Sequence, residues 1–314
     1  MSKQAKHVPV MLDEVMSVLV PRDGAIYVDA TLGGGGYSTA LLAQADCTVY
    51  AIDRDPEAIA RGRAMAARSG NKLKLIQGRF SELDALVPEK ADGIAFDLGV
   101  SSFQLDDAKR GFSFQENAPL DMRMSAQGKS AADAVNSLSE DSLIDILRRY
   151  GEEKRARAIA RAIVAARPIT HTKTLAEIVE RVLGPSARRQ KIHPATRTFQ
   201  ALRIYVNDEL GELERGLEAA ERALKPEGRL AVVAFHSLED RIVKRFLAER
   251  AGKTSRGSRH APESKPQREA TFRIILPSPR APRKSEIDAN PRSRSARLRA
   301  AIRTAAPAWS SNAA

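Results

Sequence analysis

From residue 26 the chain runs Ile26-Tyr27-Val28-Asp29-Ala30-Thr31-Leu32-Gly33-Gly34-Gly35-Gly36-Tyr37-Ser38. The apolar residues that open this stretch predict a buried β-strand, and the four glycines predict a tight turn into a helix over 38–44. A glycine-rich turn lets a ligand approach the main chain closely, and open α/β sheets bind ligands at the carboxyl ends of their strands. The stretch therefore predicts an α/β fold and the edge of the sheet that carries the site.

Strand and helix signals continue to alternate after the glycines. Apolar runs predict buried strands over 48–52, 73–76 and 93–98, with helices over 56–68 and 80–87 between them. Because strands and helices alternate, the strands should be parallel and joined by right-handed crossovers. The first hundred residues thus predict a parallel sheet of the α/β class.

The alternation breaks after Leu98. Periodic apolar patterns predict helices over 141–150, 152–166 and 174–183, and no convincing strand occurs over 105–205. We therefore expect a helical insertion of about one hundred residues in the sheet domain.

Sheet signals return near residue 208. We expect a helix over 208–224, a fully apolar strand over 230–235 and an antiparallel edge strand over 271–276. The expected domains are a discontinuous sheet domain at 1–105 and 206–314, and an inserted all-helical substrate-recognition domain at 106–205.

Excess positive charge is confined to the end of the chain. The net charge is +12; from Lys244 onward there are 17 basic and 5 acidic residues, whereas the first 243 residues carry 34 of each sign. This asymmetry favours a polyanionic partner such as nucleic acid, and the alternative is a solvated, partly disordered tail. A Gly-, Ser- and Arg-rich stretch over 252–265 predicts a mobile basic loop. Phosphate contacts are expected for Arg292, Arg294, Arg297, Arg299 and Arg303.

Composition limits the class of protein. The chain has 314 residues and one cysteine, Cys47, which excludes a disulfide framework and a zinc site built on cysteine pairs. No apolar run reaches the roughly 18 residues of a membrane span, and the first residues lack the apolar stretch of a secretory signal. We therefore expect a globular, cytoplasmic protein with no membrane partner.

A carboxylate ends the second predicted strand. Asp53 follows Gly33 by 20 residues, where it can accept hydrogen bonds from both ribose hydroxyls of an adenosine-containing cofactor. A dinucleotide fingerprint wants a third glycine, but that position is Thr39. Asp29, before the glycines, suits a positively charged ligand such as S-adenosylmethionine better than a pyrophosphate, or it is a turn or helix cap. The pattern weakens the case for NAD.

Four further residues can complete such a pocket. Phe80 follows the third strand and offers a flat apolar surface for adenine, unless it only packs in the core. Asp97, Ser101 and Gln104 lie at and after the end of the fourth strand, hence at the same edge of the sheet.

Histidines and neighbouring acids allow two interpretations. His236 follows the fifth strand at the edge expected to hold the cofactor, and Glu239 and Asp240 are either functional acids or caps of the next helix. The five histidines are not spaced like metal ligands on one helix, so we expect no zinc site. They are His7, His171, His193, His236 and His260.

The insertion carries aromatic and basic residues that suit RNA. Phe112 and Phe114 alternate with polar residues beside Arg110, and they either stack on an extruded base or are buried. A basic cluster on the insertion is expected to contact RNA backbone together with the C-terminal arginines. It consists of Arg188, Arg189, Lys191 and Arg197.

Long motifs follow one another in a single order along the chain. They are His7-x-Pro9-Val10, Asp29 to Ser38, Ala51 to Pro56, Asp97 to Asp106, Arg110 to Phe114, Pro119 to Met124, His193 to Arg203, Phe235 to Arg241 and Asn290 to Ser295. Together these motifs resemble the bacterial small-subunit ribosomal RNA methyltransferase H family, also called MraW. The resemblance spans nearly the whole chain.

The resemblance implies a class I S-adenosylmethionine-dependent methyltransferase, with a Rossmann-like sheet and an inserted all-helical domain. Its activity would be methylation of the exocyclic N4 of cytosine 1402 in 16S rRNA of the small ribosomal subunit, without a metal. Relatives often have a histidine in place of Tyr37, which matters only if that contact uses the side chain. The implied cofactor-binding residues are Gly35, Gly36, Tyr37, Asp53, Phe80, Asp97 and Gln104.

Two other classes of protein remain as alternatives: a nicotinamide dehydrogenase and a non-catalytic RNA-binding assembly factor. No catalytic base is identified. Asp97 is the candidate catalytic residue, because a carboxylate at the strand end can accept hydrogen bonds from the amine and orient it; its alternative role is cofactor binding alone. The sequence leaves the oligomeric state open.

Overall fold

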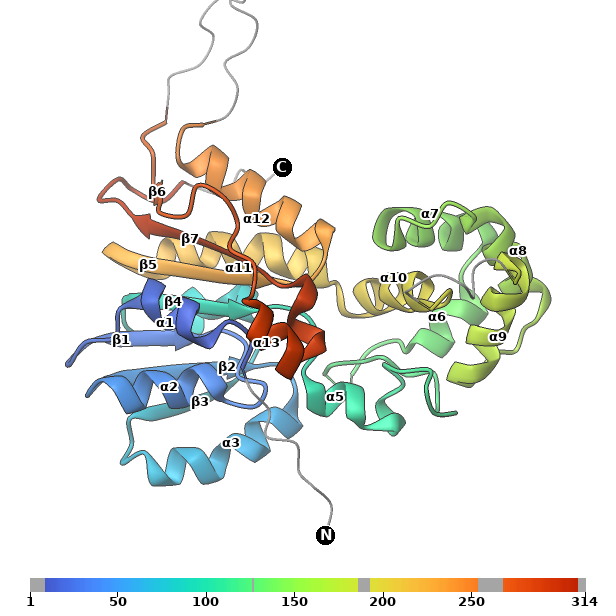
Figure 1. Ribbon diagram of the computed structural model, residues 1–314, viewed down its shortest axis with the longest axis horizontal. Coiled ribbons are helices and arrows are strands. Elements are labelled where there is room, and N and C mark those ends of the chain that lie inside the picture. Colours follow the sequence, from blue (N-terminus) through green and yellow to red (C-terminus); the bar gives the residue numbers. More distant parts are fainter. Residues whose placement is uncertain (1–8, 126, 186–192, 254–267, 310–314) are drawn as a thin grey trace, which may run out of the picture. The chain divides into compact units, whose positions relative to one another are not determined.

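The computed structural model describes residues 9–125, 127–185, 193–253 and 268–309, and it divides into two compact units (Figure 1). The sheet unit comprises Met1–Gly99 and Leu210–Ala314, and the helical unit comprises Val100–Glu209. The helical unit begins six residues before and ends four residues after the insertion expected at 106–205.

The sheet unit contains a seven-stranded sheet with the strand order β3-β2-β1-β4-β5-β7-β6. The first five strands in this order are parallel, and β7 is antiparallel to both β5 and β6. The strands are β1 (Ile26–Asp29), β2 (Thr48–Asp53), β3 (Leu73–Gln77), β4 (Ala91–Asp97), β5 (Leu224–Ala234), β6 (Phe272–Ile274) and β7 (Arg297–Arg303). Because parallel strands end at one edge, the terminal acids Asp29, Asp53 and Asp97 share that edge.

Helices cover both faces of this sheet. Successive residues of a strand point to opposite faces, so Tyr50 and Ile52 of β2 join one core while Val49 and Ala51 join the other. The first core includes α4 (Leu83–Leu86), α11 (Glu209–Ala223) and α12 (Ser237–Arg250), and the second includes α1 (Leu12–Leu19), α2 (Gly36–Gln44) and α3 (Pro56–Arg68). Short segments complete the unit: η1 (Phe80–Glu82), α13 (Lys284–Ala289) and η4 (Pro291–Ser295).

The predicted strands of the first hundred residues are confirmed, and so is the antiparallel edge strand, which is β6. The sequence interpretation missed β7, which separates β5 from β6. It contains three arginines, Arg297, Arg299 and Arg303, for which the sequence predicts phosphate contacts. In the structure Leu298 and Ala301 of β7 are fully buried, so this segment is an internal strand.

The helical unit is held together by the apolar faces of its own helices. Its core gathers Leu143 and Leu147 of one helix with Ile159, Leu175 and Leu202 of others. The described part of this unit contains no strand, apart from an isolated β-bridge between Pro119 and His171. The helices are α5 (Ser102–Asp106), η2 (Ala108–Arg110), α6 (Ala131–Ser137), α7 (Glu140–Gly151), α8 (Ala156–Ala165), α9 (Thr172–Leu183) and α10 (Thr196–Asn207).

Three of these helices match predicted ones, with shifted ends. The predicted helix over 152–166 starts only at Ala156, because Glu152 adopts a left-handed conformation (φ 48°) that ends α7. No helix in the described ranges is both long and apolar enough to cross a membrane.

Ending the chain after Ser285 should abolish the native fold of the sheet unit, because β7 is removed from between β5 and β6. Circular dichroism should then show no cooperative thermal unfolding. A chain that ends after Trp309 keeps β7 and is the matched control, with an unchanged melting temperature expected. Cooperative melting of the shorter chain at the full-length temperature would contradict this role of β7.

Candidate active site

The glycine turn after β1 has two positions where only glycine fits. Gly35 has a φ of 74°, a backbone conformation that residues with a Cβ rarely adopt. A Cβ at Gly36 would collide with the ring of Pro9, which lies against the start of α2. Side chains at these positions would force the turn to shift, so the glycines allow the chain to close tightly over the end of β1.

Asp53 ties the glycine turn to the end of β2. Its Oδ2 accepts a hydrogen bond from the Gly33 N–H at 2.8 Å, and its Oδ1 accepts one from the Asp55 N–H at 2.8 Å. Burial raises the pKa of Asp53 to about 6 despite these hydrogen bonds. The 20-residue spacing seen in the sequence therefore corresponds to a direct contact.

Asp29 holds the start of α2. Its Oδ2 accepts hydrogen bonds from the Ser38 N–H at 3.2 Å and the Ser38 hydroxyl at 2.7 Å, and Oδ1 accepts one from the Thr31 N–H at 3.3 Å. Burial raises the pKa of Asp29, and these bonds oppose the rise. The turn-and-cap interpretation of this acid agrees with these contacts.

Asp97 differs from the other two strand-end acids. Its main-chain N–H donates to the Thr31 hydroxyl at 2.7 Å, but its buried Oδ1 has no hydrogen-bond partner among the described residues. Burial, reinforced by the negative charges of Asp29, Glu239 and Glu286, raises the pKa of Asp97 to about 8. The raised pKa favours the protonated, neutral form of this carboxyl group at pH 7.

Tyr37 and Phe80 could contact a ligand through different groups, Tyr37 through its main chain and Phe80 through its ring. The Tyr37 side chain is buried, and its hydroxyl donates to the Val10 carbonyl at 2.6 Å, so only its main chain remains for contacts at the turn. Phe80 is half-buried and packs edge-to-face on Phe96, with ring centroids 5.3 Å apart. A Cβ on Gly216 would collide with the Phe80 ring, so α11 supports one side of that ring.

Gln104 belongs to the helical unit, where it takes part in a capping box at the start of α5. Its Oε1 accepts from the Ser101 N–H at 3.0 Å, and its own N–H donates to the Ser101 hydroxyl at 3.3 Å. Gln104 is buried. Ser101 and Gln104 thus have a local structural role in addition to the one expected of them.

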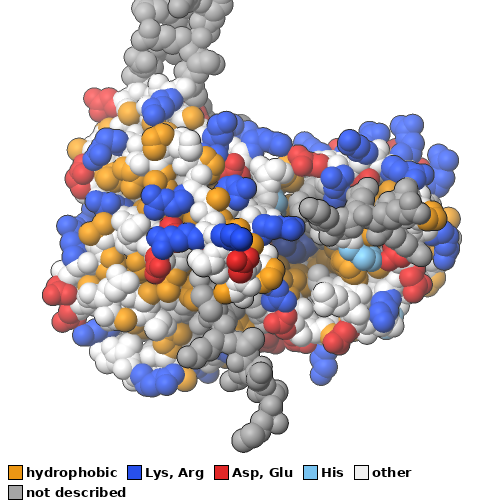
Figure 2. Space-filling view, in the orientation of Figure 1, with side chains coloured by type: hydrophobic (Ala, Val, Ile, Leu, Met, Phe, Trp, Pro, Cys, Tyr) orange, Lys and Arg blue, Asp and Glu red, His pale blue; other side chains and the backbone are white. Residues whose placement is uncertain are grey.

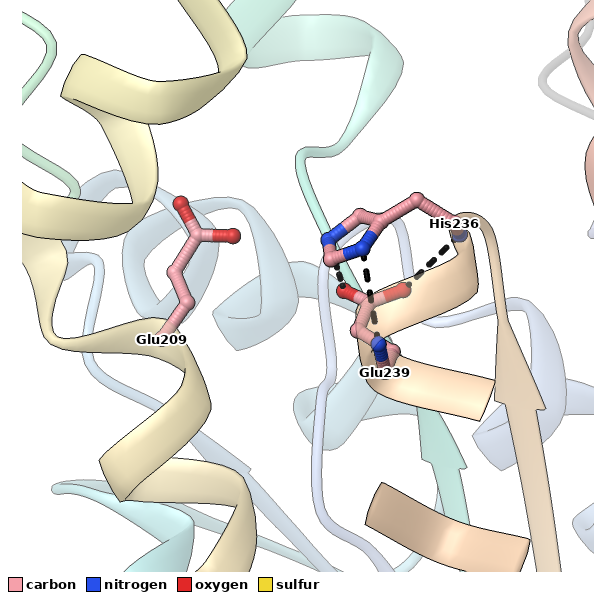
Figure 3. A group of neighbouring side chains, drawn as sticks. All are labelled: Glu209, His236 and Glu239. Atoms are coloured by element: carbon pink, nitrogen blue, oxygen red, sulfur yellow. Dashed lines mark hydrogen bonds and ion pairs between the residues drawn. The ribbon is translucent and has the colours of Figure 1, made fainter. Parts of the chain in front are cut away.

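His236 and Glu239 form the cap of α12 (Figure 3). Glu239 Oε2 accepts hydrogen bonds from the N–H groups of Phe235 at 2.8 Å and His236 at 3.3 Å. The His236 Nε2 lies 3.2 Å from Glu239 Oε1. Glu209, also drawn in Figure 3, is the first residue of α11 and binds Arg203 through both carboxylate oxygens at 2.8 Å. The capping interpretation is confirmed for Glu239.

Two arginines expected to bind phosphate instead bind protein groups. Arg299 donates through Nε and Nη2 to the two oxygens of Asp240 at 2.7 and 2.9 Å, so Asp240 is an ion-pair partner rather than a cap. Arg303 is buried and donates to the Glu221 carbonyl at 2.9 Å and the Thr271 carbonyl at 3.1 Å. The phosphate assignment of Arg299 and Arg303 is therefore wrong. Most of the predicted basic loop over 252–265 lies outside the described residues.

In the helical unit, Phe112 is buried in the core, which leaves it no face for a base. Phe114 is half-buried and packs on His193, with ring centroids 4.4 Å apart, and on Phe199 at 4.8 Å. Arg197 is exposed on α10. The remaining members of the predicted basic cluster lie outside the described residues: Arg188, Arg189 and Lys191.

Sequence reasoning missed the groups that support the acids. The Thr31 hydroxyl receives the Asp97 N–H, Ser38 binds Asp29, and Pro9 covers Gly36. Ser38 and Pro9 lie within the motifs quoted above, but only the folded chain shows which acid or glycine each one serves.

The strand order, the antiparallel β7 and the acids at the ends of β1, β2 and β4 define a Rossmann-like class I methyltransferase fold. The chain belongs to the MraW methylase family, whose family model matches residues 4–304.

Two named proteins similar to this chain in sequence agree with that membership. Ribosomal RNA small subunit methyltransferase H of Parvibaculum lavamentivorans is 57% identical over 309 residues, which cover 96% of this chain and 91% of that protein. The protein of the same name from Paramagnetospirillum magneticum is 53% identical over 311 residues, covering 96% and 97%. An rRNA methylase structure from Streptococcus thermophilus aligns with a TM-score of 0.42 at 13% identity, covering 93% of each chain.

Replacing the buried acid at the end of β4, Asp97→Asn, should stabilise the ligand-free protein, and more at pH 8.5 than at pH 5. The unfolded chain loses this proton near pH 4 and the folded protein near pH 8, so the acid lowers stability increasingly as pH rises through this window. At pH 8.5 we expect a gain of at least ~2 kcal/mol, or roughly 4 °C in Tm.

Thermal unfolding followed by circular dichroism at the two pH values measures this difference. Asp240→Asn is the control, because it breaks the ion pair with Arg299 and should lower the Tm instead. If the increase in Tm caused by Asp97→Asn is no larger at pH 8.5 than at pH 5, the pKa of Asp97 is not raised.

Proposed function

We propose that this protein is an S-adenosylmethionine-dependent methyltransferase that modifies the exocyclic N4 of the decoding-centre cytidine of 16S rRNA, on the small ribosomal subunit in the cytoplasm. The observation that carries the proposal is the buried Asp97 Oδ1, which lacks a partner in the described part of the chain and lies at the sheet edge that holds Asp53. Membership in a methylase family and the names of the relatives support an rRNA substrate.

The chain's own residues fit an adenosyl ligand with a positive charge. Each Asp53 oxygen accepts one main-chain N–H, so each has capacity left for a ribose hydroxyl. The half-exposed Phe80 ring would lie against adenine, and Asp97 would face the sulfonium. The donor, when bound, supplies a methyl group that its sulfonium charge activates. The proposed cofactor-binding residues are Gly35, Gly36, Tyr37, Asp53, Phe80, Asp97 and Gln104.

A dinucleotide fits this edge less well. Asp29 and Asp53 end two adjacent strands, and negative charge on their carboxyl groups disfavours a pyrophosphate. Thr39 stands where a third glycine is expected, and its hydroxyl donates to the Gly35 carbonyl at 2.7 Å. A non-catalytic RNA-binding factor has no use for a buried acid without a partner, since such a group lowers folding stability.

Exposed cations of the helical unit support its role in substrate recognition. Arg148 of α7, Arg157 of α8 and Lys154 between them are exposed, and they take part in no ion pair within the described residues. Figure 2 shows Lys and Arg side chains on the surface of this unit. Such unpaired cations suit RNA phosphates, because contact releases the counterions condensed on the RNA.

The direct test incubates the purified protein and labelled S-adenosylmethionine with small subunits that lack the modification. Nucleoside analysis of the 16S rRNA by mass spectrometry should detect N4-methylcytidine, and excess NAD should not compete. Absence of any methyl transfer to rRNA, in protein that binds the small subunit, would favour the assembly-factor alternative.

Asp53→Ala should weaken binding of S-adenosylmethionine and S-adenosylhomocysteine alike, at least tenfold, because both ligands carry the ribose. Charge-assisted hydrogen bonds contribute roughly 1.5 to 3 kcal/mol each. Because the pKa of Asp53 is about 6, wild-type affinity should also fall between pH 7 and pH 5, as the carboxylate takes up a proton. Isothermal titration calorimetry measures both effects.

Asp46→Ala is the control for this titration, since Asp46 is exposed just before β2, at the other end of the strand. Unchanged affinity of Asp53→Ala for both ligands would remove Asp53 from the site.

Reversing two exposed charges, with Arg148→Glu and Arg157→Glu together, should weaken binding to the small subunit and leave cofactor affinity unchanged. The dependence of log affinity on log salt should flatten by roughly 0.7 to 0.9 per lost phosphate contact. Filter binding across a salt series measures the slope. Lys72→Glu, exposed before β3 at the opposite sheet edge, is the control for charge reversal. If the double variant and Lys72→Glu have the same salt slope, this surface does not contact RNA.

A further inference from the structure

Asp97 is the last residue of β4, and the main chain that follows it leaves space around Gly99. Gly99 follows with a φ of 93°, and a Cβ built there would meet only Phe235, at 3.9 Å. The Asp97 main chain is held by Thr31, whereas Oδ1 is buried without a donor among the described residues. The backbone of this acid is thus fixed, while one of its oxygens is left for a ligand or a proton.

The charged groups with the largest effect on Asp97 are all acidic. Asp29 reaches it from β1, Glu239 from α12 and Glu286 from α13. Tyr37 of α2 also faces this group, since the charge of Asp97 contributes to the raised pKa of the Tyr37 hydroxyl. The charges that act most strongly on Asp97 therefore oppose its ionised form.

We propose that Asp97 is a proton switch that ionises when the cationic methyl donor binds and takes up the proton that the cytosine amine loses when it is methylated. This proposal rests on the proposed function. It makes Asp97 a catalytic residue, and it gives a reason for burying an acid without a partner.

The step balances in atoms and charge. The amine nitrogen forms the new N–C bond, the electron pair of the broken S–C bond stays on sulfur, and one N–H proton leaves to Asp97 Oδ1. Before transfer, Asp97 is an anion opposite a cation; afterwards it is a neutral acid beside a neutral thioether. No charge is left unpaired at either stage.

The change in charge supplies the driving force. An opposite charge within ~4 to 6 Å lowers the pKa of a carboxyl group by about 1 to 3 units. Binding of the cation therefore moves the pKa of Asp97 from about 8 to between about 5 and 7. Loss of the positive charge during transfer returns the pKa to its high value, so Asp97 becomes a proton acceptor in the same step that requires one.

Calorimetric titration of the full chain tests the binding half of the proposal. At pH 7.2, in phosphate and in Tris, which differ in ionisation enthalpy, S-adenosylmethionine should release between about 0.5 and 0.9 proton per site. The cationic analogue sinefungin should do the same, and neutral S-adenosylhomocysteine should release close to none. Asp97→Asn should abolish the release and preserve affinity for S-adenosylhomocysteine. Asp29→Asn, which removes one of the charges that raise the pKa of Asp97, should reduce the release without abolishing it.

The outcomes separate this proposal from the proposed function. If S-adenosylmethionine does not bind, the proposed function fails. If it binds without releasing a proton, or if S-adenosylhomocysteine releases as much, Asp97 is no charge-linked switch and the proposed function stands. If Asp97→Asn still releases a proton on binding S-adenosylmethionine and Asp29→Asn does not, the proton comes from Asp29 and the proposal is overturned.

A single-turnover measurement on small subunits tests the transfer half. With S-adenosylmethionine saturating, Asp97→Asn should lower the methylation rate by about 100-fold or more, because an amide cannot take up the amine proton. A near-normal rate at saturation would overturn the acceptor role and leave Asp97 with cofactor binding alone.

Discussion

A buried carboxyl group must either receive hydrogen bonds or give up its charge, and this constraint shapes the carboxyl edge of the sheet. Asp53 meets it by accepting the Gly33 N–H, and Asp29 meets it by accepting two donors from Ser38. The same hydrogen bonds fasten the glycine turn to β1 and β2, so the shape of the cofactor site depends on them. Asp97 has no such partner for Oδ1 within the described residues, and its pKa is raised to about 8.

The C-terminal segment completes the fold in a way that its charge conceals. Its arginines give the chain its excess positive charge, which is typical of an RNA-binding tail, but β7 lies inside the sheet. Arg299 neutralises Asp240, and Arg303 satisfies main-chain carbonyls at the opposite sheet edge. A count of charges cannot distinguish an arginine that binds phosphate from one that binds a carbonyl, because both uses need the same donors. For Arg292, Arg294 and Arg297, phosphate contacts stay a prediction, beside those proposed for the exposed cations of the helical unit.

In the helical unit too, the sequence pattern predicts the helices but not the individual contacts between distant residues. Amphipathic periodicity predicted α7, α8 and α9, because apolar faces must pack together to form its core. The segment that ends at Met124 is held differently: the buried Asn207 accepts the Met124 N–H at 2.8 Å and donates to the Met122 carbonyl at 2.7 Å. One amide 83 residues away leaves no periodic signal, so sequence reasoning overlooked it.

The sequence by itself determined the parallel strands, most helices and the placement of Asp53 and the glycine turn at one edge of the sheet, because each follows from local periodicity or from a short, fixed spacing. Only the tertiary structure decided that Tyr37 turns its side chain to Val10, that β7 enters the sheet, and that Asp97 rather than Asp29 lacks a partner. The physical reason is that burial and hydrogen-bond satisfaction depend on groups brought together from distant parts of the chain, and no local pattern encodes which groups those are.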